Sequence, residues 1–254
     1  IEARSGEWWS ALVYFAVERN WGGIENLYYV PGTVGAAPVQ NIGAYGAELK
    51  DSFVSLRAID LRTGREKIFT AADCAFGYRD SVFKNRYKGR YFITGVTVKL
   101  SKRPILRLDY GDIKSKLAEQ GVKHPSIQEL AEAIRQIRDS KLPNPAVLAN
   151  AGSFFKNPEI SLSAFKKLQT RFPEIKFFPA SRESLVKIPA GWLIEQAGFK
   201  GKRFGAVGMY EKQALILVNY GGATARQALA QVERVQAAVW KKFGVKIEPE
   251  VNIV

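Results

Sequence analysis

The apolar positions of this chain repeat with two different periods, and the two periods alternate in blocks along the sequence. Alternation of apolar and polar residues over 96–100 is typical of a half-buried strand, whereas apolar residues three or four positions apart after residue 126 predict a helix. The predicted strands are 1–4, 52–61, 65–70, 96–100, 214–218 and 245–254. The predicted helices begin near 5, 126, 162, 189 and 224. Blocks of strands and helices in this order predict an α+β fold.

Capping residues mark the starts of two predicted helices, and a proline-rich segment breaks the helical pattern between them. Ser126 with Glu129, and Thr224 with Gln227, have the spacing of capping boxes at the starts of two helices. The segment 141–145, Lys-Leu-Pro-Asn-Pro, interrupts the periodicity and predicts a domain boundary.

The composition is that of a globular protein, and it limits the chemistry. The 254 residues are 46% hydrophobic and 24% charged, enough for one large domain or two ordinary ones. Cys74 is the only cysteine and His124 the only histidine, so an internal disulfide is excluded and no metal site is expected. For His124 a solvated loop position is the better interpretation, and proton transfer is expected to use Ser, Tyr, Lys, Arg or carboxylate groups.

The net charge of +14 favours anionic partners. The basic residues are scattered along the chain rather than gathered in blocks, so the charge alone is weak support for nucleic acid. No apolar run approaches the length that crosses a bilayer. Nucleic acid, anionic lipid and phosphorylated small molecules all stay open at this point.

The stretch 150–158, Asn-Ala-Gly-Ser-Phe-Phe-Lys-Asn-Pro, surrounds a serine with small, aromatic and polar neighbours. Phe154 and Phe155 can form an apolar surface that excludes water beside the Ser153 hydroxyl. The lysine and asparagine that follow can bind a polar ligand. Without a histidine this hydroxyl is a poor nucleophile, but it can protonate a strongly basic carbanion or enolate. The alternative interpretation is a Gly-Ser turn with a buried aromatic pair.

Residues 30–46 form a second unusual stretch, rich in glycine and alanine, and predict a long ordered loop. Small side chains let backbone groups face a ligand directly. The spacing of a phosphate-binding P-loop and that of the dinucleotide fingerprint are both absent here. A flat ring lying against the loop fits this pattern better, and a tightly packed surface loop fits it about equally well.

Three further residues could contact a ligand. Arg79, within Phe-Gly-Tyr-Arg-Asp-Ser, is suited to holding a carboxylate or enolate, although a surface salt bridge with its neighbour Asp80 is the simpler interpretation. Tyr110 lies in a predicted turn and Glu250 follows Pro249. Their alternatives are an exposed loop tyrosine and a solvated glutamate.

Taken together, these stretches resemble one family, the UDP-N-acetylenolpyruvoylglucosamine reductases, and in particular its type I branch. The matching strings run in order over nearly the whole chain, at residues 31–46, 76–81, 138–143, 150–158, 190–194 and 248–251. The resemblance implies the remaining part of a vanillyl-alcohol-oxidase/PCMH-type FAD-binding domain over 1–140. It also implies a smaller α+β substrate-binding domain over 141–244 and a C-terminal strand, 245–254, that returns to the active site.

The resemblance further implies a reaction and the residues that perform it. NADPH would reduce FAD, and the flavin would pass hydride to the enolpyruvyl ether of UDP-N-acetylglucosamine enolpyruvate, giving UDP-N-acetylmuramate for peptidoglycan. Ser153 would donate the proton, with Arg79 and Glu250 polarising the substrate carboxylate. The residues that match nucleotide-sugar contacts are Tyr110, Lys141, Asn157 and Gln213. The positions expected to face the flavin are Gly32, Gly35, Ala36, Ala37, Pro38, Asn41, Gly43, Tyr45 and Gly46.

The family's first segment carries a Gly-x-Gly-Ser-Asn loop that cradles the FAD diphosphate, and that motif is not found in this sequence. We therefore expect the first half of the FAD domain to be absent, and the alternative to the reductase is a non-catalytic fragment that binds nucleotide-sugar. The resemblance also implies small-molecule partners, no nucleic acid or membrane partner, a monomer, and a cytoplasmic location.

Overall fold

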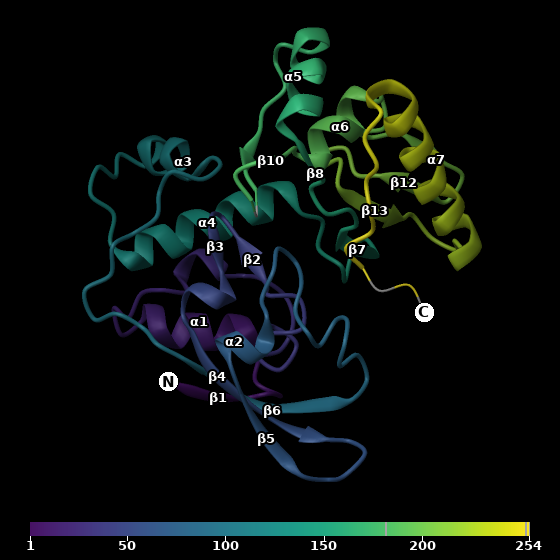
Figure 1. The fold of residues 1–254 in the computed structure, drawn as a ribbon. Helices are drawn as coiled ribbons and strands as arrows, with labels where there is room; N and C mark the ends of the chain where they lie inside the picture. The colour runs from purple at the N-terminus through teal and green to yellow at the C-terminus, as the bar shows by residue number, and fades with distance from the viewer. Residues whose placement is uncertain (181, 252, 254) are drawn as a thin grey trace. The chain divides into compact units, whose positions relative to one another are not determined.

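The computed structural model describes residues 1–180, 182–251 and 253 (Figure 1). Contacts between Cα atoms divide the chain into two compact units, Ile1–Ser140 and Lys141–Val254. We call them the N-terminal unit and the C-terminal unit and describe each by itself.

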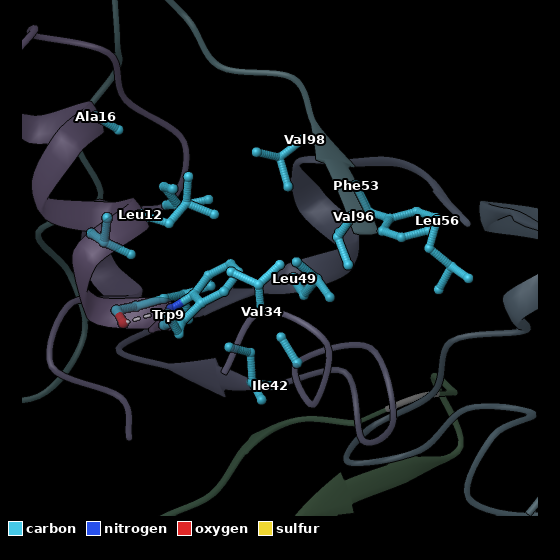
Figure 2. Close-up of a cluster of buried hydrophobic side chains, with 14 of the residues drawn as sticks. Trp9, Leu12, Ala16, Val34, Ile42, Leu49, Phe53, Leu56, Val96 and Val98 are labelled. Atoms are coloured by element: carbon cyan, nitrogen blue, oxygen red, sulfur yellow. Dashed lines mark hydrogen bonds between the residues drawn. The ribbon is translucent and has the colours of Figure 1, made fainter. Parts of the chain in front are cut away.

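The N-terminal unit is built on a four-stranded antiparallel sheet with the strand order β1-β6-β4-β5. The strands are β1 (Glu2–Arg4), β4 (Phe53–Asp60), β5 (Glu66–Thr70) and β6 (Tyr91–Val98). One face of the sheet is buried, because apolar side chains of β4 and β6 pack with those of helix α1 (Trp9–Val17), as Figure 2 shows. The Trp9 indole is fully buried and its N–H donates to the Leu27 carbonyl at 3.1 Å. This bond ties α1 to the loop that follows it.

Short elements surround that sheet. They are the 3₁₀ turns η1 (Glu25–Leu27) and η2 (Leu49–Asp51), the two-stranded hairpin of β2 (Gly43–Ala44) and β3 (Ala47–Glu48), and the helices α2 (Ala71–Cys74), α3 (Ile113–Glu119) and α4 (Ile127–Lys141). Helices α3 and α4 share a small apolar cluster that contains Leu117, Leu130 and Ile134. The predicted capping box of α4 is confirmed, because Ser126 Oγ accepts the Glu129 N–H and Glu129 accepts the Ser126 N–H at 2.7 Å.

The described residues of the C-terminal unit form two antiparallel sheets and three helices. One sheet has the order β11-β12-β13-β7, formed by Arg203–Phe204, Val207–Met209, Ile216–Asn219 and Asn150–Ser153. The other has the order β8-β10-β9, formed by Glu159–Ser161, Leu185–Lys187 and Phe178–Pro179. The helices are α5 (Leu162–Arg171), α6 (Ala190–Gln196) and α7 (Ala225–Phe243). Their shared core includes Phe155, Leu193 and Val235, which are almost completely buried.

Helix α7 begins and ends where the sequence predicts. Thr224 and Gln227 form the expected capping box, and Gly244 adopts φ +66° as the residue after the last turn. That left-handed conformation favours glycine because a side chain would be strained there. The long amphipathic pattern and both of its end signals are local, which is why they could be predicted.

Three predicted elements differ from the structure. The first helix begins at Trp9 rather than near residue 5, because a turn precedes it, with the Glu7 N–H bonded to the Arg4 carbonyl. The strand expected at 96–100 ends at Val98 and begins much earlier, at Tyr91. The segment 245–251 is not assigned as a strand. Among the described residues it makes one bridge, between Pro249 and Phe155, and the Phe154 N–H that would extend this pairing donates to the Leu215 carbonyl instead. Residues 252 and 254 of that prediction lie outside the described residues.

We expect the Cys74 thiol to be unreactive in the native protein. It is fully buried, and burial raises its pKa to about 12, so almost no thiolate, the reactive species, forms at pH 8. Ellman's reagent should detect no thiol under native conditions and one per chain in urea. Rapid native labelling at pH 8 would contradict this expectation and show that the core of the N-terminal unit opens easily.

Candidate active site

A tight turn in the N-terminal unit positions Arg79. Gly77 and Asp80 pair through two backbone hydrogen bonds of 3.0 and 3.3 Å, and Arg79 between them adopts φ +55°. Its guanidinium Nη2 donates to the Gly43 carbonyl at 2.6 Å and lies over the Tyr78 ring, with the central carbon 5.3 Å from the ring centroid. A Cβ added at Gly43 would lie 2.6 Å from Arg79 Nη1, so any larger residue here would force the guanidinium to move.

Two tyrosines lie beside that turn. The rings of Tyr45 and Tyr110 meet edge to face with centroids 6.4 Å apart, and Tyr110 also packs against Gly46. Burial raises the pKa of both phenols, opposed by the charge of Arg79 at Tyr110 and by the charge and hydrogen bond of Arg138 at Tyr45. Both hydroxyls therefore stay protonated and can donate hydrogen bonds at neutral pH. Burial lowers the pKa of Arg138.

The loop predicted to face a flavin exposes mostly small groups. Gly32, Gly35, Gly43 and Tyr45 are half-buried and Ala36 and Gly46 are exposed, whereas the remaining three predicted positions, Ala37, Pro38 and Asn41, are buried beneath the loop. A Cβ added at Gly32 would meet nothing within 4 Å. This surface fits a flat ring system lying against it, and the buried positions would act only through the shape of the loop.

In the C-terminal unit, Ser153 is the last residue of β7 and is exposed. It pairs with Ile216 of β13, and the next residue, Phe154, donates its N–H to the Leu215 carbonyl at 2.8 Å. Phe154 and Phe155 are buried with their ring centroids 5.3 Å apart, so the aromatic pair expected from the sequence is present. The backbone of Ser153 is therefore fixed at the end of a strand, next to the buried core.

The C-terminal segment runs antiparallel to the residues that follow Ser153. The Glu250 N–H donates to the Phe154 carbonyl at 2.7 Å, and the Lys156 N–H donates to the Glu248 carbonyl at 3.0 Å. The Lys156 ammonium also pairs with the Glu248 carboxylate at 2.6 Å. The structure thus brings the backbones of Ser153 and Glu250 next to each other, while Lys156, considered above as a ligand anchor, is engaged in an ion pair.

The other predicted contacts of the C-terminal unit gather at the start of helix α6. Asn157 Oδ1 accepts the Ala190 N–H at 2.8 Å, and Gln213 Oε1 lies 3.3 Å from the position of a Cβ added at Gly191. Lys141 is the last residue of α4 and begins this unit.

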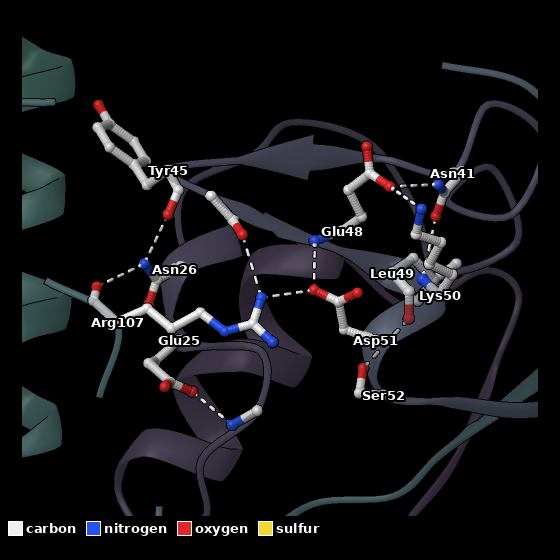
Figure 3. A network of polar contacts seen from close by, with 12 residues as sticks. Glu25, Asn26, Asn41, Tyr45, Glu48, Leu49, Lys50, Asp51, Ser52 and Arg107 are labelled. Atoms are coloured by element: carbon white, nitrogen blue, oxygen red, sulfur yellow. Dashed lines mark hydrogen bonds and ion pairs between the residues drawn. The ribbon is translucent and has the colours of Figure 1, made fainter. Parts of the chain in front are cut away.

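Sequence reasoning missed two side chains that support the hairpin of β2 and β3. Asn26 is 2% exposed, and its amide donates to the carbonyls of Tyr45 at 2.8 Å and of Arg107 at 3.0 Å (Figure 3). The Arg107 guanidinium in turn donates to the Gly46 carbonyl at 3.0 Å and to Asp51 at 2.6 Å. Nothing in the local sequence around Asn26 could have indicated partners so distant in the chain.

Across residues 1–180, 182–251 and 253, no helix is long and apolar enough to cross a membrane. Within the same residues, no three His, Cys, Asp or Glu side chains gather in an arrangement that could hold a metal ion. The expected monomeric state and cytoplasmic location stay predictions.

Comparison with known proteins places this arrangement in a class. Residues 1–69 match the FAD binding domain family, and residues 144–254 match the C-terminal domain of UDP-N-acetylenolpyruvoylglucosamine reductase. The chain is therefore a flavin-dependent oxidoreductase with an FAD-binding domain and a separate C-terminal domain.

Whole-chain comparisons identify the family. The chain is 50% identical to the UDP-N-acetylenolpyruvoylglucosamine reductase of Flavobacterium johnsoniae over its full length and covers 75% of that protein. For the enzyme of the same name from Pseudomonas aeruginosa, the identity is 47% over the full chain, with 74% of that protein covered. The chain belongs to the UDP-N-acetylenolpyruvoylglucosamine reductase family, as the resemblance predicted, and it spans about three quarters of these relatives.

A solved structure supports the fold. The reductase of the same name from Thermus caldophilus matches with a TM-score of 0.66 at 22% identity, covering 99% of this chain and 71% of that one. The predicted α+β fold, with part of an FAD-binding domain and a second α+β domain, is confirmed. The exact domain limits and the roles of individual residues stay predictions.

We expect Asn157→Ala to destabilise the C-terminal unit. The change removes the acceptor of the Ala190 N–H, a group at the start of α6 that the helix itself cannot satisfy. Urea unfolding should show a loss of about 1–2 kcal/mol in the free energy of unfolding. Asn144→Ala is the matched control, because the side chain of exposed Asn144 accepts a local N–H, that of Ala146, two residues away. Equal effects of the two changes would contradict the assignment.

Proposed function

We propose that this protein reduces the enolpyruvyl ether of UDP-N-acetylglucosamine enolpyruvate to UDP-N-acetylmuramate, a step of peptidoglycan precursor synthesis. The observation that carries the proposal is its identity of 46–50% to curated reductases over nearly the whole chain. The alternative, a fragment that binds nucleotide-sugar without catalysis, is not favoured by that finding. The net charge of +14 suits a substrate with a diphosphate and a carboxylate and a cosubstrate with an additional phosphate.

FAD, when bound, supplies the hydride chemistry of the reaction, with NADPH as the source of the hydride. The N-terminal unit is proposed as the FAD-binding domain, and the small-residue surface around Gly32, Ala36 and Gly43 is proposed to lie against the flavin ring. The C-terminal unit is proposed as the substrate-binding domain, with residues 245–254 supplying Glu250.

Ser153 is proposed to donate the proton to the substrate carbon. A serine hydroxyl is a very weak acid, so this role requires a strongly basic carbon, such as an enolate or carbanion next to a carboxylate. Arg79 and Glu250 are proposed to stabilise that negative charge by holding and polarising the substrate carboxylate. The backbone hydrogen bond between Glu250 and Phe154 supports a joint role, because it places Glu250 beside Ser153.

The sugar-nucleotide is proposed to contact Tyr110, Lys141, Asn157 and Gln213. The protonated phenol of Tyr110 is suited to donating to a phosphate oxygen, since burial raises its pKa. Asn157 and Gln213 lie near the same helix start, and the acceptor of Asn157 is already used by Ala190. Asn157 would therefore contribute its N–H₂ group to a ligand.

We expect Ser153→Ala, made in the full-length enzyme loaded with FAD, to slow only the second half of the catalytic cycle. Bleaching of the flavin absorbance by NADPH should stay within about twofold of the unchanged enzyme. Recovery of the absorbance on addition of the enolpyruvyl substrate should slow by about 10²–10⁴-fold, the usual contribution of a general acid. Stopped-flow absorbance measures both rates.

Ser163→Ala is the control for this change, because Ser163 is an exposed hydroxyl at the start of α5 that bonds to Ser161. It should leave both rates unchanged. If Ser153→Ala slowed bleaching and recovery equally, the serine would not be the proton donor of the second half. If no flavin recovery occurred with the unchanged enzyme, the proposed activity itself would be wrong.

A further inference from the structure

Asn41 is a fully buried amide whose hydrogen-bonding groups are taken by the protein. Its Nδ2 donates to Glu48 Oε2 at 3.0 Å and to the Gly77 carbonyl at 2.9 Å, and its Oδ1 accepts the Lys50 N–H at 3.0 Å. Figure 3 shows this side chain facing Glu48 and Lys50. Both amide hydrogens are therefore used inside the N-terminal unit, and neither is offered to a ligand.

The orientation of this amide is fixed by its neighbours. Glu48 can only accept at its carboxylate, and the Lys50 backbone N–H can only donate, so the nitrogen and oxygen of Asn41 cannot exchange places. The Lys50 ammonium also pairs with Glu48 at 2.8 Å, which holds the carboxylate in place. The second amide hydrogen is consequently directed at one acceptor, the Gly77 carbonyl.

Gly77 begins the turn that carries Arg79. The Asn41 bond holds the first residue of this turn. A second bond holds the residue directly after the turn, because Ser81 Oγ donates to the Val39 carbonyl at 2.7 Å. Val39 and Asn41 belong to the same loop, so one segment holds the backbone on both sides of Arg79. Its guanidinium makes a third contact with that segment, at Gly43.

We infer that Asn41 is a positioning residue for Arg79, not a ligand of the cofactor through its side chain. The inference rests on the proposed role of Arg79 toward the substrate carboxylate. Arg79 has φ +55°, a conformation that a non-glycine residue leaves when its surroundings do not hold it. Loss of the Asn41 donor would let the turn relax and move the guanidinium away from the carboxylate it should meet.

The test uses the full-length reductase loaded with FAD. Asn41→Ala should slow flavin recovery by the enolpyruvyl substrate about ten- to a hundredfold, the range expected when a binding group moves by about 1 Å. The KM for that substrate should rise, while the FAD content and the rate of flavin bleaching by NADPH stay within about twofold. Ser81→Ala, which removes the other clamp, should produce the same pattern and serves if Asn41→Ala does not fold.

A double-mutant cycle with Arg79→Ala separates the possible outcomes. If Asn41 acts through Arg79, adding Asn41→Ala to Arg79→Ala should slow recovery by less than about twofold more. Fully multiplicative losses, or a loss of FAD from Asn41→Ala, would overturn the inference alone. A harmless Arg79→Ala would overturn the proposed role of the arginine and the inference with it.

Asp60→Asn controls for general destabilisation of the N-terminal unit. Asp60 is 6% exposed and pairs with Arg90 at 3.0 Å at the last residue of β4, with no bond to the turn of Arg79. It should lower stability without changing the KM for the enolpyruvyl substrate. The same KM increase in Asp60→Asn would show that the Asn41 effect is general loss of stability and would overturn the inference.

Discussion

The hairpin of β2 and β3 has two strands, so the carbonyl of Gly43 at its edge and those of Tyr45 and Gly46 in its turn need partners from outside the hairpin. Side chains from three distant segments provide them for Gly43, Tyr45 and Gly46. The donors are Arg79, Asn26 and Arg107. Because each donor also belongs to or holds another loop, these bonds join the small-residue loop 30–46, the turn of Arg79 and the segment before Tyr110 into one structure.

In the C-terminal unit, two segments are joined mainly through their backbones. Strand β7 lies at the edge of its sheet, and the segment after it is joined to residues 248–250 through two hydrogen bonds and the bridge between Phe155 and Pro249. The pairing is short because the Phe154 N–H donates to the Leu215 carbonyl, yet it is sufficient to bring Glu250 beside the residue that follows Ser153. A proposed proton donor and a proposed carboxylate are thus related by the geometry of two adjacent extended segments.

The features that could be predicted from sequence are those with local causes. The capping boxes of α4 and α7 involve residues three positions apart, and the strand and helix periods reflect one buried face. Asn41 could be placed in an unusual loop, but the role of its amide depends on Gly77, thirty-six positions away. Asn26 depends on Arg107, eighty-one positions away, so no local pattern could indicate it.

Three non-glycine residues of the proposed site, Asn41, Tyr45 and Arg79, have φ between +45° and +55°. Each costs about 1–2 kcal/mol relative to glycine, which adopts this conformation without strain. At each position the side chain makes a contact that glycine could not: the amide clamp, the bond of the phenol to Arg138, and the guanidinium contact with Gly43. Strain at these positions is therefore the consequence of needing a particular side chain at a sharp turn. The unfavourable φ persists because the same hydrogen bonds that shape each turn also hold its side chain in place.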